Sequence, residues 1–344
     1  MRPFTFERAA APEQAVDAFA AHPHARYLAG GTNLVDLMKL GVERPEHLID
    51  VSGLALDQVE TTPEGGLRAG ANVRNSDLAA HPAVRRAYPG LSQALLAGAS
   101  GQLRNVATTG GNLLQRTRCP FFQDTSTPCN KREPGTGCSA REAASRDMAV
   151  LGHSAACVAT HPSDMAVALA ALDAKVEVLG PEGPRTVPVT GFHRLPGDSP
   201  ERDTVLAPGE LITHVTLPPL PEGARSGYLK ARDRASYAFA LASAAAVLVL
   251  DGDGGIRHAS LAFGGLAHRP WRATAAEEAL RGAPATPESY ARAAEAELAA
   301  AEPLSENGFK VPLARGLAVR LLTTLAQSPD ESPDDSFADS PDGA

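Results

Sequence analysis

The chain has little of several residue types, and each shortage excludes a class of protein. It has four cysteines and one tryptophan in 344 residues. A chain of this length does not need disulfides for stability, unlike small secreted domains that depend on several of them. The net charge is −8, which argues against nucleic-acid and anionic-membrane binders, because both classes need clustered Lys and Arg. We therefore expect neither nucleic acid nor a membrane as a partner.

Long apolar runs are also absent. The most apolar stretch, from Tyr237 to Leu250, is interrupted by Ser243 and stops at Asp251. It is too short to cross a bilayer, which takes about 20 apolar residues. The first residues show no basic region followed by an apolar stretch, so no signal peptide is predicted. On these grounds we expect a cytoplasmic protein in a reducing compartment.

What is present is the pattern of a globular α+β protein with two or three domains. Hydrophobic residues make up 43% of the chain, which is enough for a sizeable core. Pro12 is well placed to start a helix that runs to about Ala21. A strand at 26–29, a glycine loop and a helix from Leu34 follow. Further along we expect strands at 47–51, 67–71, 156–159, 175–179 and 211–217, and helices at 76–80, 91–96 and 163–172.

A proline cluster at 218–221 marks a domain boundary. Beyond it, alternating segments at 228–232, 239–250 and 256–263 predict a small antiparallel sheet, and helices at 288–301 and 313–326 predict a cover for one face. We expect a first domain at 1–222, with subdomains at about 1–55 and 56–222, and a second at 223–327. The Ser-, Pro- and Asp-rich residues 328–344 are expected to be disordered.

All four cysteines, Cys119, Cys129, Cys138 and Cys157, lie in one stretch of the chain. Between about 116 and 146 this stretch shows little hydrophobic periodicity and needs something to order it. Zinc sites usually draw on short loops such as C-x-x-C, whereas these wide gaps favour an iron–sulfur cluster. Zinc is the second interpretation, and disulfides or an ordinary buried Cys157 the third. His153 is a conceivable substitute ligand, although a surface histidine is the simpler interpretation.

Two glycine-rich loops carry the chemistry of a phosphate-binding cofactor. Gly30-Gly31-Thr32-Asn33 lies between the strand at 26–29 and the following helix. Bare backbone amides and a hydroxyl are brought together there, although a double glycine alone is often only a tight turn. The second loop, at 105–112, offers hydroxyls, an amide side chain and two more glycines. A long cofactor such as FAD needs several such contact sets, and this pair of loops favours it.

These motifs resemble those of a known family. They are Leu28-Ala29-Gly30-Gly31-Thr32-Asn33-Leu34, the nonapeptide from Arg104 to Asn112, Pro162-Ser163-Asp164, and Tyr228-Leu229-Lys230. The sequence resembles, almost end to end, the FAD-binding subunit of the xanthine dehydrogenase and carbon monoxide dehydrogenase family of molybdoenzymes. The resemblance implies an α+β fold of the vanillyl-alcohol-oxidase type, in which two subdomains enclose FAD, followed by a C-terminal flavoprotein domain of antiparallel sheet and helices.

The resemblance also implies roles for single residues. The first loop would hold the pyrophosphate of FAD, the second the flavin end and ribityl chain, and Asp164 a cofactor hydroxyl. Asp164 could instead be only a first-turn carboxylate, Lys230 either a charge that favours reduced flavin or a salt-bridged surface lysine, and Tyr228 either a stacking or a core residue. The implied cofactor-binding residues are Leu28, Ala29, Gly30, Gly31, Thr32, Asn33, Leu34, Ala107, Thr108, Thr109, Gly111, Asn112, Asp164 and Lys230.

Ordinary members of this family lack the stretch from Arg118 to Cys138, which lies within the expected iron–sulfur segment at 116–157. It is similar to the extra segment of the bacterial periplasmic aldehyde oxidoreductases, which implies a [4Fe–4S] cluster on Cys119, Cys129, Cys138 and Cys157. The implied partners are a large molybdenum-cofactor subunit, a small [2Fe–2S] subunit and an external electron acceptor, and export with a signal-bearing partner becomes an alternative to the cytoplasm. In the electron transfer that the resemblance implies, from the molybdenum subunit through the [2Fe–2S] subunit to FAD, this chain needs no catalytic acid or base. A stand-alone flavin oxidase and a zinc-binding, non-enzymatic module are the other hypotheses. Positive charge near the cysteines, from Arg116, Arg118, Lys131, Arg132 and Arg141, would raise a cluster's potential or form a solvated face.

Overall fold

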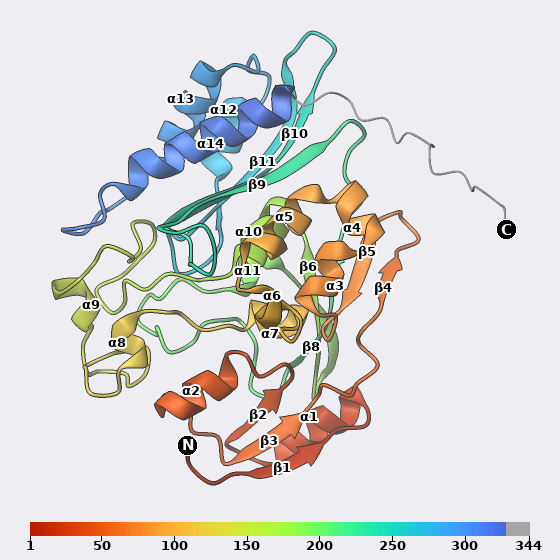
Figure 1. The fold of residues 1–344 in the computed structure, drawn as a ribbon, viewed down its shortest axis with the longest axis vertical. Helices are drawn as coiled ribbons and strands as arrows, with labels where there is room; N and C mark the ends of the chain where they lie inside the picture. Colours follow the sequence, from red (N-terminus) through yellow and green to blue (C-terminus); the bar gives the residue numbers. More distant parts are fainter. Residues whose placement is uncertain (328–344) are drawn as a thin grey trace, which may run out of the picture.

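The computed structural model describes residues 1–327, and three sheets organise them (Figure 1). In Figure 1 a small N-terminal unit lies at the bottom, a second sheet with short helices in the middle, and a third sheet with its helices at the top. The α+β architecture with a C-terminal antiparallel sheet and helices, predicted from the sequence, is confirmed. No helix in the described part of the chain is long and apolar enough to cross a membrane.

The N-terminal unit is a parallel sheet of three short strands. Its strands are β1 (Thr5–Arg8), β2 (Ala25–Leu28) and β3 (His47–Asp50), in the order β1-β3-β2. Parallel neighbours need crossover connections, and α1 (Pro12–Ala21) and α2 (Leu34–Leu40) provide them. Helix α1 begins at Pro12, as predicted, because the first turn of a helix has amides without partners and proline has no amide hydrogen. The turn between β2 and α2 is the first glycine loop.

The middle sheet is antiparallel and has five strands in the order β4-β5-β8-β6-β7. They are β4 (Val59–Thr61), β5 (Leu67–Gly70), β6 (Lys175–Gly180), β7 (Gly183–Pro188) and β8 (Leu211–Leu217). The helices around it are α3 (Asn75–Ala80), α4 (Pro82–Ala87), α5 (Pro89–Ala97), α6 (Gly101–Arg104), α7 (Thr109–Leu113), α10 (Asp164–Ala171) and α11 (Val189–Phe192).

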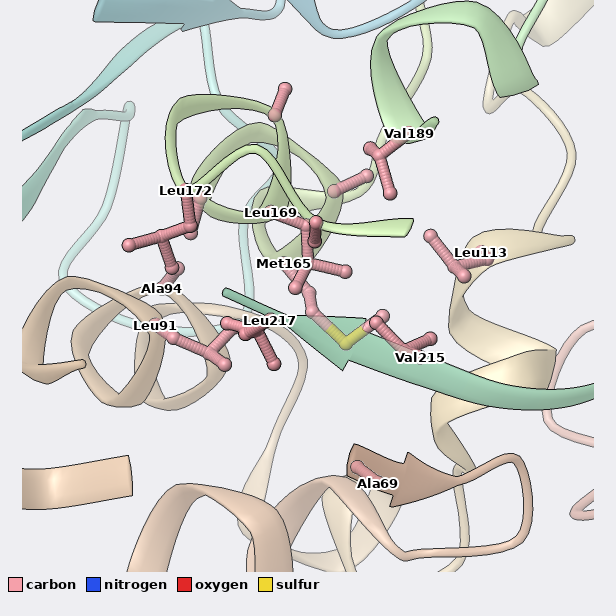
Figure 2. Packing of buried hydrophobic residues seen from close by; sticks show 14 of the residues in the cluster. Ala69, Leu91, Ala94, Leu113, Met165, Leu169, Leu172, Val189, Val215 and Leu217 are labelled. Atoms are coloured by element: carbon pink, nitrogen blue, oxygen red, sulfur yellow. The ribbon is translucent and has the colours of Figure 1, made fainter. Parts of the chain in front are cut away.

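Helix α10 lies at the centre of this unit. Figure 2 shows Met165 of α10 directed toward Val215 of β8, and Leu169 of α10 and Leu91 of α5 belong to the same buried cluster. All eight residues of α10 are buried. Such packing makes a shift of α10 costly, because close-packed cores tolerate little change in volume. The start of α10, which carries Ser163 and Asp164, is therefore held in a fixed position.

The C-terminal sheet has the order β12-β11-β10-β9 and is antiparallel. Its strands are β9 (Arg225–Ala231), β10 (Ala242–Leu250), β11 (Ile256–Gly264) and β12 (Trp271–Arg272). The helices α12 (Thr274–Leu280), α13 (Pro287–Leu298) and α14 (Lys310–Gln327) cover one face, as Figure 1 shows. The other face contacts α5 and α10, so alternate residues of β10 belong to different cores.

The cysteine segment contains little regular structure. Its two short helices are α8 (Pro120–Gln123) and α9 (Ser139–Glu142). The strand predicted at 156–159 was wrong, because no neighbouring strand pairs with it: Val158 accepts a hydrogen bond from the Ala149 amide, and Cys157 accepts one from Ser154. The predicted disordered tail, 328–344, lies outside the described residues. Strands β1, β4, β7 and β12 and the short helices α4, α6, α7, α8, α9, α11 and α12 were not predicted.

Candidate functional site

A large cleft opens between the three units of the fold. Its volume is about 950 Å³, near the upper end of the range for ligand sites, which is about 300–1,000 Å³. Both glycine loops, the start of α10 and the connection between β9 and β10 contribute to its wall. The cleft therefore has room for a long cofactor and brings together motifs that are far apart in the sequence.

The first glycine loop is pressed against the second. A Cβ built on Gly30 would lie 2.1 Å from the carbonyl oxygen of Val106, so no larger residue fits there. Gly31 has a φ of +71°, in the left-handed region that glycine adopts readily. Asn33 accepts a hydrogen bond from the Arg116 amide through Oδ1 (2.9 Å), while its Nδ2 is buried and has no partner among the described residues. The side-chain amide of Asn33 is therefore a hydrogen-bond donor on the cleft wall, and an oxygen atom of a ligand could accept from it.

The threonine hydroxyls of the second loop form hydrogen bonds within the protein and do not line the cleft. Thr108 caps α7 by accepting a hydrogen bond from the Gly111 amide (3.2 Å). Thr109 is fully buried and donates to the carbonyl oxygen of Val73 (2.9 Å). Ala107, Gly111 and Asn112 are the parts of this loop that line the cleft. The two hydroxyls thus shape the wall.

The structure separates the predicted cofactor residues into two groups. Those that line the cleft are Gly30, Gly31, Thr32, Asn33, Ala107, Gly111, Asn112 and Asp164. Those that do not are Leu28, Ala29, Leu34, Thr108, Thr109 and Lys230. Leu28 ends β2 and Leu34 begins α2, so the first motif continues into the elements on both sides of its loop.

Asp164 is the centre of a buried polar cluster at the start of α10. Ser163 caps the helix, accepting from the Ala166 amide (3.0 Å), and its hydroxyl contacts Asn112 Oδ1 at 2.5 Å. Asp164 Oδ2 lies 2.7 Å from Lys230 Nζ, and Tyr228 donates its hydroxyl hydrogen to Asp164 Oδ1. Burial raises the pKa of Tyr228 well above its ordinary value, and the charge of Asp164 adds to this, so the hydroxyl stays protonated.

This cluster decides two alternatives that the sequence left open. Lys230 is salt-bridged, but its side chain is 3% exposed, so it is a core lysine rather than a surface one. Its charge is paired with that of Asp164. Tyr228 is buried in the hydrophobic core and does not line the cleft, which excludes stacking on a ligand in this arrangement.

The connection between β9 and β10 contributes residues that the sequence did not single out. Asp233, Arg234, Tyr237 and Phe239 line the cleft, and Tyr237 is an exposed residue with a φ of +50°. Arg118 also lines the cleft, with its guanidinium 5.4 Å from the centre of the Phe239 ring. Burial lowers the pKa of Arg118 from its usual value. In the sequence, the only indication of this wall was the pair of aromatic residues Tyr237 and Phe239 close to the charged residues Asp233 and Arg234.

The four cysteines converge on a second, much smaller cavity. They line it together with Phe121, Phe122, Pro128, Lys131, Ser139, Ala140 and Ala159. Cys119, Cys129 and Cys157 are buried and Cys138 is half-buried, and all four are free thiols. Burial raises the pKa of Cys119 to about 11 and that of Cys157 to about 12. Cys119 also lines the large cleft, so the two cavities share a wall.

Hydrogen bonds from two side chains hold the cysteine loops. Asn130 accepts from the amides of Gly135 (3.1 Å) and Gly137 (2.8 Å) and donates to Ala156 O (3.0 Å). Arg132 donates to the carbonyl oxygens of Phe121 and Phe122, both at 2.8 Å. These contacts bring the loops that carry the four cysteines together in the absence of a sheet.

Two of the five cations predicted around the cysteines, Arg116 and Lys131, pair with carboxylates. Lys131 is 1% exposed and pairs with Asp203, which also binds Arg116 at 2.7 Å. Burial alone would raise the pKa of Asp203, but these two cations hold it well below its usual range. Arg116 binds Glu43 as well, and Arg141 donates to Ser154 O (3.0 Å). In the described structure Arg132 and Arg141 donate to backbone carbonyl oxygens, so the set is neither one solvated face nor fully paired with carboxylates.

The histidine beside the cysteines is not the one considered from the sequence. His153 is accessible to solvent and its Nε2 lies 2.8 Å from Glu302 O, which leaves it as an ordinary surface residue. His268, in the turn between β11 and β12, places Nε2 3.8 Å from Cys157 Sγ. Both of these side chains are buried. The two residues are 111 positions apart in the sequence, so no local pattern indicated this contact.

Among the described residues, one group places its candidate ligand atoms all within 4.8 Å of one another: Glu7, His22 and His47. Hydrogen bonds account for it, because His47 contacts Thr5 Oγ1 (2.6 Å) and Glu7 Oε1 (2.9 Å). The cysteine sulfurs form no group this tight within the described chain. A tetrahedral zinc ion would hold its sulfurs only about 3.8 Å apart, given Zn–S bonds of about 2.3 Å.

Comparisons with known proteins agree with this geometry. Residues 2–220 match the family model described as the FAD binding domain in molybdopterin dehydrogenase, and residues 227–325 match the CO dehydrogenase flavoprotein C-terminal domain. The aldehyde oxidoreductase FAD-binding subunit PaoB of Escherichia coli is 56% identical over 95% of this chain and 100% of its own length. The putative xanthine dehydrogenase FAD-binding subunit XdhB of the same species is 29% identical, over 81% of this chain and 80% of its own.

Among solved structures, a chain of the carbon monoxide dehydrogenase from Hydrogenophaga pseudoflava superposes with a TM-score of 0.74. It is 25% identical, and the match covers 94% of this chain and 97% of the other. Both matched family domains and the full-length similarity thus agree with the cleft in identifying one family. The chain belongs to the FAD-binding subunits of the molybdenum hydroxylases, the family that includes the xanthine and carbon monoxide dehydrogenases.

Proposed function

We propose that the chain is the FAD- and [4Fe–4S]-binding electron-transfer subunit of a heteromeric molybdenum hydroxylase that oxidises aldehydes. The observation that carries the proposal is the position of Cys119. It lines both the cavity formed by the four cysteines and the cleft formed by the glycine loops. A metal centre in the first cavity would therefore adjoin a cofactor in the second.

The cleft fits FAD. Its volume suits a long ligand, Gly30 lets the two glycine loops approach closely, and Asn33 offers an unpaired buried donor. Gly30–Asn33 would hold phosphate oxygens, while Ala107, Gly111, Asn112 and Asp164 would bind the remaining polar groups. When bound, FAD supplies chemistry that links one-electron donors to one- or two-electron acceptors. The protein's own contribution is to position it.

The cysteine cavity fits an iron–sulfur cluster better than zinc. Four thiols and no carboxylate line it, and thiolate-only ligation is typical of iron–sulfur centres. The sulfurs are too dispersed to form a group of the size that one ion requires. A cluster binds each thiolate to a different iron and therefore accepts a wider set. The raised thiol pKa values of Cys119 and Cys157 mean that binding must release protons.

Similarity to PaoB supports an aldehyde as the substrate of the complex. We expect the partners to be a large subunit with the molybdenum cofactor and a small [2Fe–2S] subunit, with an external acceptor that receives the electrons. This assignment leaves the chain without a substrate-side acid or base. Asp164, one of the carboxylates on the cleft wall, is tied to Lys230 and Tyr228 and is not available as one.

Anaerobic purification followed by visible spectroscopy and metal analysis tests the proposal. We expect flavin bands with about one FAD and about four irons per chain. Zinc in place of iron, with no flavin, would show that the chain is a zinc-binding module. Turnover of a small alcohol by this chain alone, with release of peroxide, would instead identify a stand-alone flavin oxidase.

A further inference from the structure

The contact between His268 and Cys157 joins the C-terminal domain to the cysteine cavity. Nε2 of His268 lies 3.8 Å from Sγ of Cys157, within the range for a hydrogen bond to sulfur. His268 is 7% exposed and Cys157 is 4% exposed, so water does not compete for the contact. An N–H donated to sulfur is worth more in such surroundings than at a surface.

The other ring nitrogen indicates where the proton lies. Nδ1 of His268 is buried and has no hydrogen-bond partner among the described residues. A neutral imidazole carries one proton, and placing it on Nδ1 would bury an N–H without an acceptor. It would also turn the Nε2 lone pair toward the sulfur. Nε2–H is therefore the favoured tautomer, and a protonated ring would carry a hydrogen there as well.

Backbone amides provide the other donors near these sulfurs. Those of Phe121 and Phe122 face Cys119, and that of Ala159 faces Cys157. Side-chain substitution cannot remove an amide, but it can remove His268. Lys131 is the nearby cation: its ammonium group binds Asp203 and Pro200 O, and its charge partly offsets the rise in the pKa of Cys157 that burial causes. The histidine is thus a replaceable donor at a ligand sulfur.

We propose that His268 is a positioning residue that donates its Nε2–H to the sulfur of Cys157 and raises the reduction potential of the cluster held there. The inference rests on the proposed iron–sulfur function. Reduction adds one electron to the centre and makes the ligand sulfurs more negative, with no bond to the protein formed or broken. A hydrogen bond to sulfur therefore stabilises the reduced state more than the oxidised one.

A redox titration of the full-length protein, purified anaerobically with the subunits that accompany it, tests this. Dithionite serves as reductant and the low-temperature EPR signal as readout. His268→Leu should lower the equilibrium constant for one-electron reduction roughly tenfold, a downward shift of about 59 mV. His268→Gln, which keeps an N–H donor, should recover much of the loss. An unchanged potential in His268→Leu with four irons retained overturns the inference.

His193→Leu is the matched control. His193 is also buried, but its Nε2 contacts Leu113 O (2.8 Å) and no sulfur, so its removal should leave the potential unchanged. A shift as large as that of His268→Leu would mean that loss of any buried histidine acts through packing, and would overturn the specific role.

A measurement on the unmodified protein keeps the inference testable even if His268→Leu fails to fold. With ¹⁵N-labelled histidine, pulsed EPR of the reduced cluster should detect coupling to one histidine nitrogen. Absence of that coupling in a protein that contains the cluster overturns the role of His268 and leaves the proposed function intact. Absence of iron from the purified protein is a different result, because it removes the proposed function itself.

Discussion

Lys230 Nζ lies 2.7 Å from Asp164 Oδ2, and both side chains are nearly inaccessible to solvent. The pair joins β9 of the C-terminal domain to the start of α10, at the wall of the cofactor cleft. Removing one partner of a buried ion pair leaves the other charge uncompensated.

Lys230→Met should therefore destabilise the protein strongly. We expect the free energy of unfolding to fall by about 3 kcal/mol, because the carboxylate of Asp164 would remain buried with only Tyr228 as a donor. Urea denaturation at neutral pH measures this. The double variant Lys230→Met with Asp164→Leu should recover part of the loss, and a single variant as stable as the parent would contradict the buried charge.

Gly30→Ala should separate the two glycine loops and release FAD. The added Cβ would lie 2.1 Å from Val106 O, and that atom is backbone and cannot rotate away. We expect at least a tenfold loss of FAD affinity, measured by flavin fluorescence after dialysis. Gly101→Ala is the control, because the nearest atom to its Cβ, in Arg104, is 4.0 Å away. Equal FAD retention in both variants would contradict the close contact.

Cys129→Ser should remove the proposed iron–sulfur centre and leave most of the FAD. Cys129 lines the small cavity and not the large cleft, whereas Cys119 lines both. We therefore expect iron to fall to near zero with FAD retained in Cys129→Ser, and FAD to fall as well in Cys119→Ser. Iron and FAD per chain are the measurements. Loss of both cofactors from Cys129→Ser would mean that the segment supports the whole flavin site.

Stability should depend on pH through His193. Burial lowers the pKa of His193 to about 4, whereas the unfolded value is about 6.5. The unfolded chain therefore binds more protons in this window, so stability falls as the pH drops from about 6.5 to 4, by up to about 3 kcal/mol. His193→Leu should show a shallower decline over this range in denaturant titrations. An identical slope in both proteins would exclude His193 as the source.

Local sequence patterns predicted much of the fold. Pro12 begins α1 and Ser163 caps α10 because both effects depend on residues within one turn of the helix. The strand expected at 156–159 shows the limit of this approach. Ala156 to Ala159 has the composition of a strand, yet a strand requires a partner, and which segments meet is decided by distant packing.

The cofactor site likewise has residues that the sequence indicated and contacts that only the structure shows. By itself the sequence identified the candidate ligand groups: the glycine loops, whose close backbone approach only glycine permits, and four cysteines gathered in one stretch of the chain. Only the tertiary structure decided which groups meet. It buried Lys230 against Asp164, 66 residues away, and placed His268 beside Cys157, 111 residues away. Such contacts leave no periodic or local trace in the sequence, because they arise where elements far apart along the chain pack together and exclude water between them.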